Sequence, residues 1–289
     1  MIVEFIIVLV PNLFMLSVNF HCWLKRGMLS SVDLIIVGLA FSSIIYGSVN
    51  CIITIILLFS PGMSSVTFIV STCCSLFAFY SNAWLVTCLC FYFYVKIINF
   101  EHRFLSWLKM KIDTLVPWMI LAAEVFSIFS SLLYTFTCIG VNIVNSTASY
   151  MTNQTPGYIS NTFCDKGYEI INFYIPILIA TVATGHIIVS LYKHTHRMGH
   201  NMGDGGGTSL EVHKRAARTL SSIVIYYIII FGLELCFTFS QISKGYILEV
   251  FLNLLTPIFI FVQSVILILG NNRLLQKCVK ILNTFKGKT

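Results

Sequence analysis

Charged residues are scarce in this chain of 289 residues. Lys, Arg, Asp and Glu make up 10% of it, 57% of the residues are hydrophobic, and the mean hydropathy is +0.87. A soluble domain of ordinary composition carries about 25% charged residues. The shortage of charge therefore excludes a soluble globular protein and predicts a chain that lies mostly within a membrane.

The motifs of common catalytic and cofactor sites are also missing. The glycine-rich stretch 203–207 is not followed by the Gly-Lys-Ser/Thr of a phosphate-binding loop, and no His-Glu-x-x-His, Cys-x-x-Cys or Gly-x-Ser-x-Gly motif occurs. His194, His196 and His200 lie among basic residues without a neighbouring pair of carboxylates, which argues against a metal site. We therefore expect neither an enzyme nor a bound cofactor.

Three classes of membrane protein lack sequence support as well. The last apolar run contains no lysine, which excludes a retinal protein that needs a Schiff base. No paired half-repeats with broken helices indicate a transporter, and no carbonyl filter or ring of acidic residues indicates a channel. A small seven-span transporter or channel is kept only as the alternative from a different class.

The chain consists instead of long apolar runs, each long enough for the roughly 20 residues that cross a bilayer. They lie near 2–24, 32–58, 68–95, 115–140, 169–192, 219–241 and 248–270. The predicted fold is an all-α membrane protein, a bundle of seven transmembrane helices that forms one domain over 1–289. The tail 271–289 has apolar residues at helical spacing and basic residues opposite them, which predicts a short amphipathic helix on the membrane surface.

Basic residues are distributed unevenly between the runs. Sixteen of the 18 Lys and Arg residues lie in alternate gaps or in the tail, and the opposite gaps contain only Lys166 and Lys244. Because basic residues stay on the cytoplasmic side, we expect a plasma-membrane protein with its N-terminus outside and its C-terminus inside. The first run lacks a preceding basic segment and is expected to be a retained span. The net charge of +7 lies beside the spans, which favours contact with anionic lipid over nucleic acid.

Polar side chains within apolar runs are costly and are therefore functional candidates. Glu234 lies at a depth that suits the wall of an outward-opening cavity, whereas Glu124 is expected to make a structural contact between helices. Smaller polar groups are expected to connect helices through hydrogen bonds. These are Asn12, Asn19, Ser42, Ser43, Gln263, Ser264 and Asn271. Pro11, Pro176 and Pro257 each mark either a fixed bend or a pivot.

The outer halves of the third and seventh runs combine aromatic residues with small polar ones. Small organic ligands need an apolar pocket with a few polar groups, although ordinary helix packing explains the same composition. The candidate ligand site consists of these residues and the carboxylate noted above. Its members are Ser75, Phe79, Tyr80, Glu234, Asn253 and Thr256.

The ten cysteines do not form a disulfide framework. Eight of them, including Cys138, lie within or at the edges of apolar runs and are expected to pack as small apolar residues. Cys164 lies in an outer gap and is a candidate disulfide partner for Cys73 or Cys74. Cys278 follows the last run beside basic residues, which makes it a candidate for palmitoylation.

The gap 141–168 contains two N-glycosylation triplets, at Asn145 and Asn153. Both copies fall in a loop that the charge distribution places outside the cell. We expect at least one of them to carry sugar, and Pro156 makes Asn153 the weaker acceptor.

Motifs at the ends of the runs are more specific. Lys-Ile-Ile-Asn-Phe (96–100) and Trp-Leu-Lys (107–109) follow the third run, and Ser-Leu-Tyr-Lys-His (190–194) closes the fifth. With matching pieces in the other runs, they cover nearly the whole chain, which resembles the bitter taste receptor family (taste receptor type 2). The related type 1 vomeronasal receptors are a neighbouring possibility that these elements favour less.

Several positions depart from the pattern of that family. Ser43 stands where the family usually has Arg, Phe79 where it has Asn, and Ser75 where it has a pocket Trp. Ile230 occupies the aromatic switch position of the sixth span, and Gln263 replaces a His. The resemblance therefore indicates a divergent member, compatible with a non-mammalian branch, with an altered ligand preference.

The resemblance implies a G-protein-coupled chemosensory receptor for small, mostly apolar bitter compounds. Its expected partners are the small-molecule ligand, a heterotrimeric G protein of the gustducin class, and membrane lipid. Ligand binding would act by favouring one state of the bundle over another. The residues expected to face the G protein are Lys96, His102, Lys109, Lys193, His194, His213 and Arg218.

Overall fold

The computed structural model describes residues 2–59, 65–98, 103–140, 167–201, 215–229, 232 and 246–286. Nearly all of these residues are helical, and none of them lies in a strand, so the predicted all-α fold is confirmed for this part of the chain. Residues 215–229 form a helix that carries no label in the figures. The labelled elements are α1 (Ile2–Arg26), α2 (Ser31–Phe59), α3 (Ser65–Ile97), α4 (Arg103–Tyr134), η1 (Thr135–Gly140), η2 (Ile170–Tyr174), α7 (Ile175–Asn201), α9 (Tyr246–Gly270) and α10 (Asn272–Lys286).

Five of the described helical segments are long and apolar enough to cross a membrane. They are Phe5–Arg26, Ser31–Ile56, Val66–Ile97, Ser106–Cys138 and Gly167–Lys193, and they coincide with the first five predicted runs. A sixth is added if Ile258–Gly270 and Asn272–Thr284, which meet at a bend of 101°, count as one span. The described start of the sixth predicted run is helical, and α9 covers the seventh.

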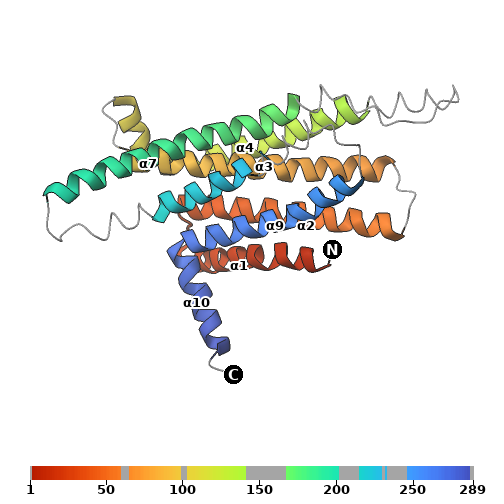
Figure 1. Cartoon of the computed structure of the whole chain (residues 1–289), viewed down its shortest axis with the longest axis horizontal. Coiled ribbons are helices and arrows are strands. Elements are labelled where there is room, and N and C mark those ends of the chain that lie inside the picture. Colours follow the sequence, from red (N-terminus) through yellow and green to blue (C-terminus); the bar gives the residue numbers. More distant parts are fainter. Residues whose placement is uncertain are drawn as a thin grey trace.

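The helices are arranged as an antiparallel bundle (Figure 1). Consecutive helices alternate in direction, the N-terminal end of α1 lies at one end of the bundle, and α10 leaves from the other. α3 packs against α2, α4 and α7. It is the central helix. In its most apolar stretch 61% of the residues are buried, compared with 28–39% in the other four candidate spans. Side chains on α3 can therefore contact most of the bundle.

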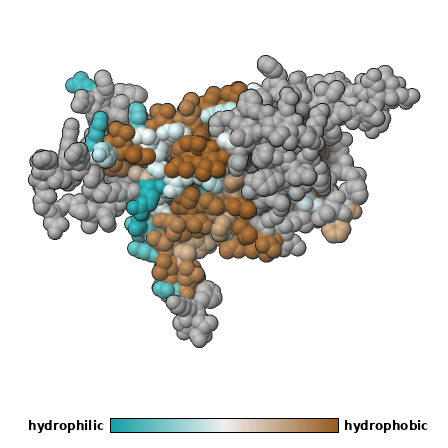
Figure 2. Space-filling view, in the orientation of Figure 1, coloured by the Kyte–Doolittle hydropathy of each residue, from teal (hydrophilic) through white to brown (hydrophobic). Residues whose placement is uncertain are grey.

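The outward surface of the bundle is apolar. Large side chains such as Trp118, Phe129, Leu178 and Ile229 are exposed. Figure 2 shows brown, hydrophobic residues through the middle of the described surface, with teal residues towards the end from which α10 leaves. An apolar surface this extensive is unfavourable in water and favourable in the hydrocarbon of a bilayer.

The amphipathic helix predicted in the tail is α10, which begins at a capped corner. Asn271 lies between α9 and α10, and its Oδ1 accepts from the backbone N–H groups of Arg273 (3.0 Å) and Leu274 (3.4 Å). Asparagine is a favoured residue at this position because its side chain satisfies free N–H groups at the start of a helix. Leu274 is fully buried against the bundle, whereas Leu282 is exposed. The first turn of α10 is therefore anchored while its far end projects.

Of the proline interruptions, Pro176 changes the form of the helix. Proline has no N–H, so the carbonyl of Asn172, four residues earlier, loses its usual donor. The preceding turn is a π-helix, η2, in which the N–H of Ile175 donates to the carbonyl of Ile170. Pro11, by contrast, lies inside a continuous α1.

Gly270 marks a close approach of two helices and gives a test of the packing. A Cβ atom at Gly270 would overlap the side chain of Thr219, whereas one at Gly185 would meet nothing within 4 Å. We expect Gly270→Ala to lower the stability of the bundle by about 1–3 kcal/mol. The melting temperature of the purified protein in detergent checks this, with a thiol-reactive dye reporting exposure of the buried Cys88 and Cys90.

Gly185→Ala is the matched control, since it adds the same methyl group in open space. Its melting temperature should equal or exceed that of the unaltered protein. Equal losses in the two variants would contradict a specific contact between α9 and the helix 215–229.

Candidate ligand-binding and signalling sites

Phe79 lies at the centre of a group of aromatic rings. Its ring stacks on Phe173 with centroids 5.1 Å apart, and the rings of Tyr46 and Tyr80 lie 6.4 and 6.1 Å away. Phe173 also contacts Tyr227, at 6.2 Å. These five residues, here called the aromatic cluster, come from α2, α3, η2 and the helix 215–229. The cluster brings together Phe79 and Tyr80 of the predicted ligand site with Phe173, which sequence reasoning missed.

The structure describes the other predicted ligand residues to different extents. Ser75 lies one turn before Phe79 in α3, and its buried hydroxyl has no partner among the described groups. Asn253 and Thr256 lie on α9, and their side chains are outside the described part. Glu234 is outside the described residues altogether.

Asn82, three residues after Phe79, connects four helices through its amide. Its Nδ2 donates to Ser43 Oγ (3.1 Å) on α2. Its Oδ1 accepts from the Tyr227 hydroxyl (2.7 Å) and from Gln263 Nε2 (2.9 Å) on α9. This Asn82 cluster unites Ser43 and Gln263, two of the positions that depart from the expected pattern. Hydrogen bonds between membrane helices contribute about 0.6 kcal/mol each on average.

Further polar contacts connect helices as predicted. Ser81 Oγ donates to Glu124 Oε1 (2.8 Å) and lies 2.7 Å from Ser42 Oγ, which joins α2, α3 and α4. Ser264 Oγ donates to Asn12 Oδ1 (3.1 Å), which joins α9 to α1. The structural assignment of Glu124 and of the small polar groups is therefore confirmed.

At the α10 end of the bundle, Lys96 is already paired. Its Nζ lies 3.2 Å from Asp113 Oδ2 on α4 and donates to the Tyr92 hydroxyl at 2.6 Å. Asp113 Oδ1 also accepts from Tyr92 (3.0 Å) and from Ser31 Oγ (2.7 Å) on α2. Half-exposed pairs of this kind are worth little individually. Their effect here is to fix the ends of α2, α3 and α4 relative to one another.

Of the remaining residues predicted to face the G protein, the structure describes the side chains of three. Lys109 donates to the carbonyl of Ile98 (3.2 Å), and Lys193 and Arg218 are exposed. His194 lies in α7, but its side chain is outside the described part. His102 and His213 are outside the described residues.

A second ion pair fastens α10 to the bundle. Arg273 lies 2.8 Å from Asp33 at the start of α2, where Asp33 is nearly buried. Arg273 also donates to Asn19 and Cys22 of α1, and Asn271 Nδ2 donates to Asp33 Oδ1 (3.2 Å). Breaking a buried pair by removing one partner leaves an uncompensated charge and is strongly destabilising. The position of α10 against the bundle therefore depends on residues of α1 and α2.

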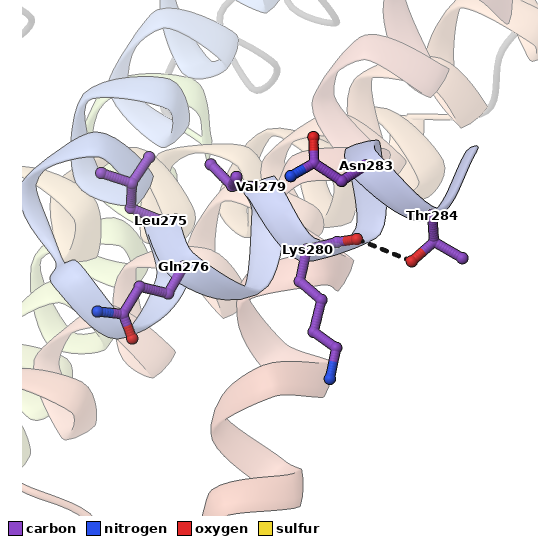
Figure 3. A pocket seen from close by; sticks show the side chains of 6 residues that line it. All are labelled: Leu275, Gln276, Val279, Lys280, Asn283 and Thr284. Atoms are coloured by element: carbon purple, nitrogen blue, oxygen red, sulfur yellow. Dashed lines mark hydrogen bonds between the residues drawn. The ribbon is translucent and has the colours of Figure 1, made fainter. Parts of the chain in front are cut away.

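After Arg273, α10 carries an open groove of about 620 Å³ (Figure 3). Its lining mixes apolar, amide and basic side chains. These are Leu275, Gln276, Val279, Lys280, Asn283 and Thr284. Cys278, the palmitoylation candidate, is a half-buried free thiol that packs against the bundle core.

The structure confirms Cys73 and Cys74 as packing residues, rules out the candidate pairing with Cys164 and shows that the expectation for Cys138 was wrong. Cys73 and Cys74 are free thiols, so neither pairs with Cys164, which lies outside the described residues. Cys73 Sγ instead faces Ser131 Oγ of α4 at 3.9 Å, which is a packing contact. Cys138, expected to be a packing residue, is disulfide-bonded. Spacing along the chain could not reveal this because disulfide formation depends on the relative placement of two Cβ atoms.

Comparison with known proteins identifies the family of this chain. The family model for taste receptor protein (TAS2R) matches residues 1–286. The chain belongs to that family. Taste receptor type 2 member 8 from Gorilla gorilla gorilla and from Homo sapiens are each 28% identical to it, over 98% of this chain and 94% of theirs. Taste receptor type 2 member 9 from Papio hamadryas is 28% identical over 96% of this chain and 89% of its own.

Membership of this family settles the class of protein. The relatives are taste receptors, which are G-protein-coupled receptors and not enzymes. With its apolar helices, this chain is accordingly a multi-pass membrane receptor of the taste receptor family. The resemblance noted from the end-of-span motifs is thereby confirmed over the whole length.

Asn82 gives a direct test of the polar contacts. We expect Asn82→Leu to lower stability by about 2 kcal/mol, because three hydrogen bonds between helices are lost at once. Asn50→Leu is the matched control, since among the described residues Asn50 Nδ2 donates within α2, to the carbonyl of Tyr46. The melting temperature in detergent should fall in the first variant well below that of the second. Equal melting temperatures would contradict the role of Asn82 in connecting helices.

The cysteine assignments predict a labelling pattern. In protein denatured without reductant, a thiol-alkylating reagent should label Cys73 and Cys74 and leave Cys138 unlabelled. After reduction, Cys138 should take up a second, isotopically heavy reagent, which peptide mass spectrometry detects. Labelling of Cys138 before reduction would contradict its disulfide.

Proposed function

We propose that the chain is a seven-span bitter taste receptor of the plasma membrane, one domain over 1–289, with its N-terminus outside. The observation that carries the function is the match of the taste receptor family model to residues 1–286. The orientation is supported by the antiparallel helices, which put the start of α1 and the whole of α10 at opposite ends (Figure 1). Lys25, Lys96, Lys193 and Arg273 belong to helix ends at the α10 side, which is the side that basic residues favour for the cytoplasm.

The ligand is a small, mostly apolar organic compound, bound in the half of the bundle away from α10. The aromatic cluster supports this assignment, because stacked rings bind apolar compounds and the unpaired hydroxyl of Ser75 offers one polar contact. We assign the site to the residues predicted from the sequence. These are Ser75, Phe79, Tyr80, Glu234, Asn253 and Thr256.

The cytoplasmic partner is a gustducin-class heterotrimeric G protein that docks at the α10 end. Exposed Lys193 and Arg218 are available to it there, whereas Lys96 is engaged by Asp113. We infer that Lys96 reaches the G protein only in the state in which this pair opens. The wider set assigned to this surface includes His102, Lys109, His194 and His213.

Ligand binding then acts as a population shift. A compound stabilises the receptor state for which it has the higher affinity, by no more than that difference in affinity. The Asn82 cluster lies one turn along α3 from Phe79 and joins α2, α3, α9 and the helix 215–229. Because these helices continue towards the α10 end, a change in the cluster alters the surface presented to the G protein.

Lipid contact and modification complete the proposal. The amphipathic α10 lies on the inner membrane surface, where Lys277 and Lys280 face anionic headgroups. Cys278 beside them accepts palmitate. Asn145 and Asn153 carry sugar on the outer side.

Calcium release in cells that also express a chimeric taste G protein tests the function. A panel of bitter compounds should elicit a response in receptor-expressing cells only. Phe79→Ala should raise the half-maximal concentration about three- to tenfold, since an aromatic pair contributes about 0.5–1.5 kcal/mol. Phe129→Ala, which removes an exposed ring of α4, is the matched control and should respond normally.

Two outcomes would contradict this function. One is a receptor that reaches the cell surface and responds to no compound of the panel. The other is ligand-driven current or uptake in cells that lack the G protein, which would indicate a channel or transporter.

The proposed orientation predicts the behaviour of the glycosylation sites. The double variant Asn145→Gln, Asn153→Gln should lose the mass shift that glycosidase produces in the unaltered receptor. Gel mobility before and after glycosidase treatment measures this. A glycosidase-sensitive shift that persists in the double variant would argue against the assigned outer loop.

A further inference from the structure

Asn172 in η2 has a buried amide oxygen without a partner. The side chain is fully buried, and its Nδ2 donates to the backbone carbonyl of Tyr168 at 3.1 Å. No described group donates to its Oδ1. A reversed amide would place its oxygen 3.1 Å from the carbonyl oxygen of Tyr168, so that two acceptors would face each other. Unpaired acceptors are uncommon inside folded proteins, and each one needs a physical explanation.

The local sequence explains why Asn172 points inward. Because Pro176 cannot donate to the carbonyl of Asn172, the turn before it adopts the wider π form. In this turn the consecutive residues Asn172 and Phe173 are both buried. The carbonyl of Pro176 is held in turn by Thr87 Oγ1 of α3, at 2.9 Å. Such π turns occur frequently at functional sites.

Asn172 directly precedes Phe173 of the aromatic cluster, to which the proposed function assigns the ligand. Phe173 stacks on Phe79 of α3, which fixes η2 against that helix. Ser75, one turn before Phe79, has a buried hydroxyl that likewise lacks a partner among the described groups. Both α3 and α7 begin at the same end of the bundle (Figure 1). Ser75 precedes Phe79 in α3 and Asn172 directly precedes Phe173 in η2, so both polar residues come before the stacked rings in helices that start from this end.

We propose that Asn172 Oδ1 accepts a hydrogen bond from the ligand and selects aromatic compounds that carry an N–H or O–H donor. The stacked rings bind the apolar part of such a compound, and the free amide oxygen binds its donor. The inference rests on the proposed function, since it places a ligand at the aromatic cluster. It adds a chemical class of ligand and a residue outside the predicted site.

Two substitutions separate this role from a structural one. Asn172→Val removes both the acceptor and the donor to Tyr168. Asn172→Asp keeps an acceptor oxygen and loses the Nδ2 that holds the backbone of η2. If Asn172 has only a structural role, both variants should impair the receptor. If Asn172 accepts a hydrogen bond from the ligand, Asn172→Asp should keep the response and Asn172→Val should lose it.

The probes are pairs of aromatic compounds that differ by methylation of one donor. Acetanilide with N-methylacetanilide, and 4-ethylphenol with 4-ethylanisole, are suitable pairs. Each is tested by calcium release and by thermal stabilisation of the purified receptor, which reports binding independently of signalling. We expect the unaltered receptor to prefer the donor-bearing member by about tenfold or more. Asn172→Asp should keep this preference, and Asn172→Val should lose it.

Three results would overturn the inference. They are equal potency of the two members at the unaltered receptor, a preference that persists in Asn172→Val, and a preference lost alike in both variants. In each of these, a calcium response of the unaltered receptor to other compounds leaves the proposed function standing. Absence of both calcium release and thermal stabilisation for every compound would overturn the proposed function and this inference together.

Discussion

Polar side chains surrounded by hydrocarbon need partners, and in this bundle the partners come from other helices. The constraint is strongest on α3, whose central position puts it in contact with α2, α4 and α7. Ser81 pairs with α2 and α4, Thr87 with the carbonyl of Pro176, and Asn82 with three helices at once. Since water cannot replace these contacts in a membrane, the choice of partner fixes how the helices lie against one another.

The same constraint links the two ends of the molecule. Away from α10, the aromatic cluster brings together rings from four elements, and Ser75 Oγ and Asn172 Oδ1 beside it have no partner among the described groups. At the α10 end, Lys96 and Asp113 join α3 to α4, and Arg273 and Asp33 join α10 to α2. The Asn82 cluster lies between them on α3. We infer that ligand binding affects the surface at the α10 end by changing which of these paired arrangements is the more stable.

The sequence predicted the elements well because the length of an apolar run and the spacing of apolar and basic residues are local properties of the chain. The first five spans, the amphipathic α10 and the structural contact of Glu124 are examples. It could not predict which residues meet, since pairs such as Asn82 with Tyr227 are far apart in the chain and depend on helix rotation. The disulfide of Cys138 and the burial of the Asn172 side chain likewise depend on the three-dimensional arrangement. Pro176 is the one visible signal for the latter, and from the sequence alone it indicates no more than a bend or a pivot.

A double-mutant cycle between Asn82 and Tyr227 tests most directly whether hydrogen bonds on α3 hold the helices together. Asn82→Leu, Tyr227→Phe and the combined variant are unfolded in mixed micelles, and their free energies of unfolding are compared. The account predicts a coupling energy of about 0.6–1.7 kcal/mol, between the average and the largest value measured for hydrogen bonds between membrane helices. Effects that add to within about 0.3–0.5 kcal/mol would contradict it, because independent sites behave in that way.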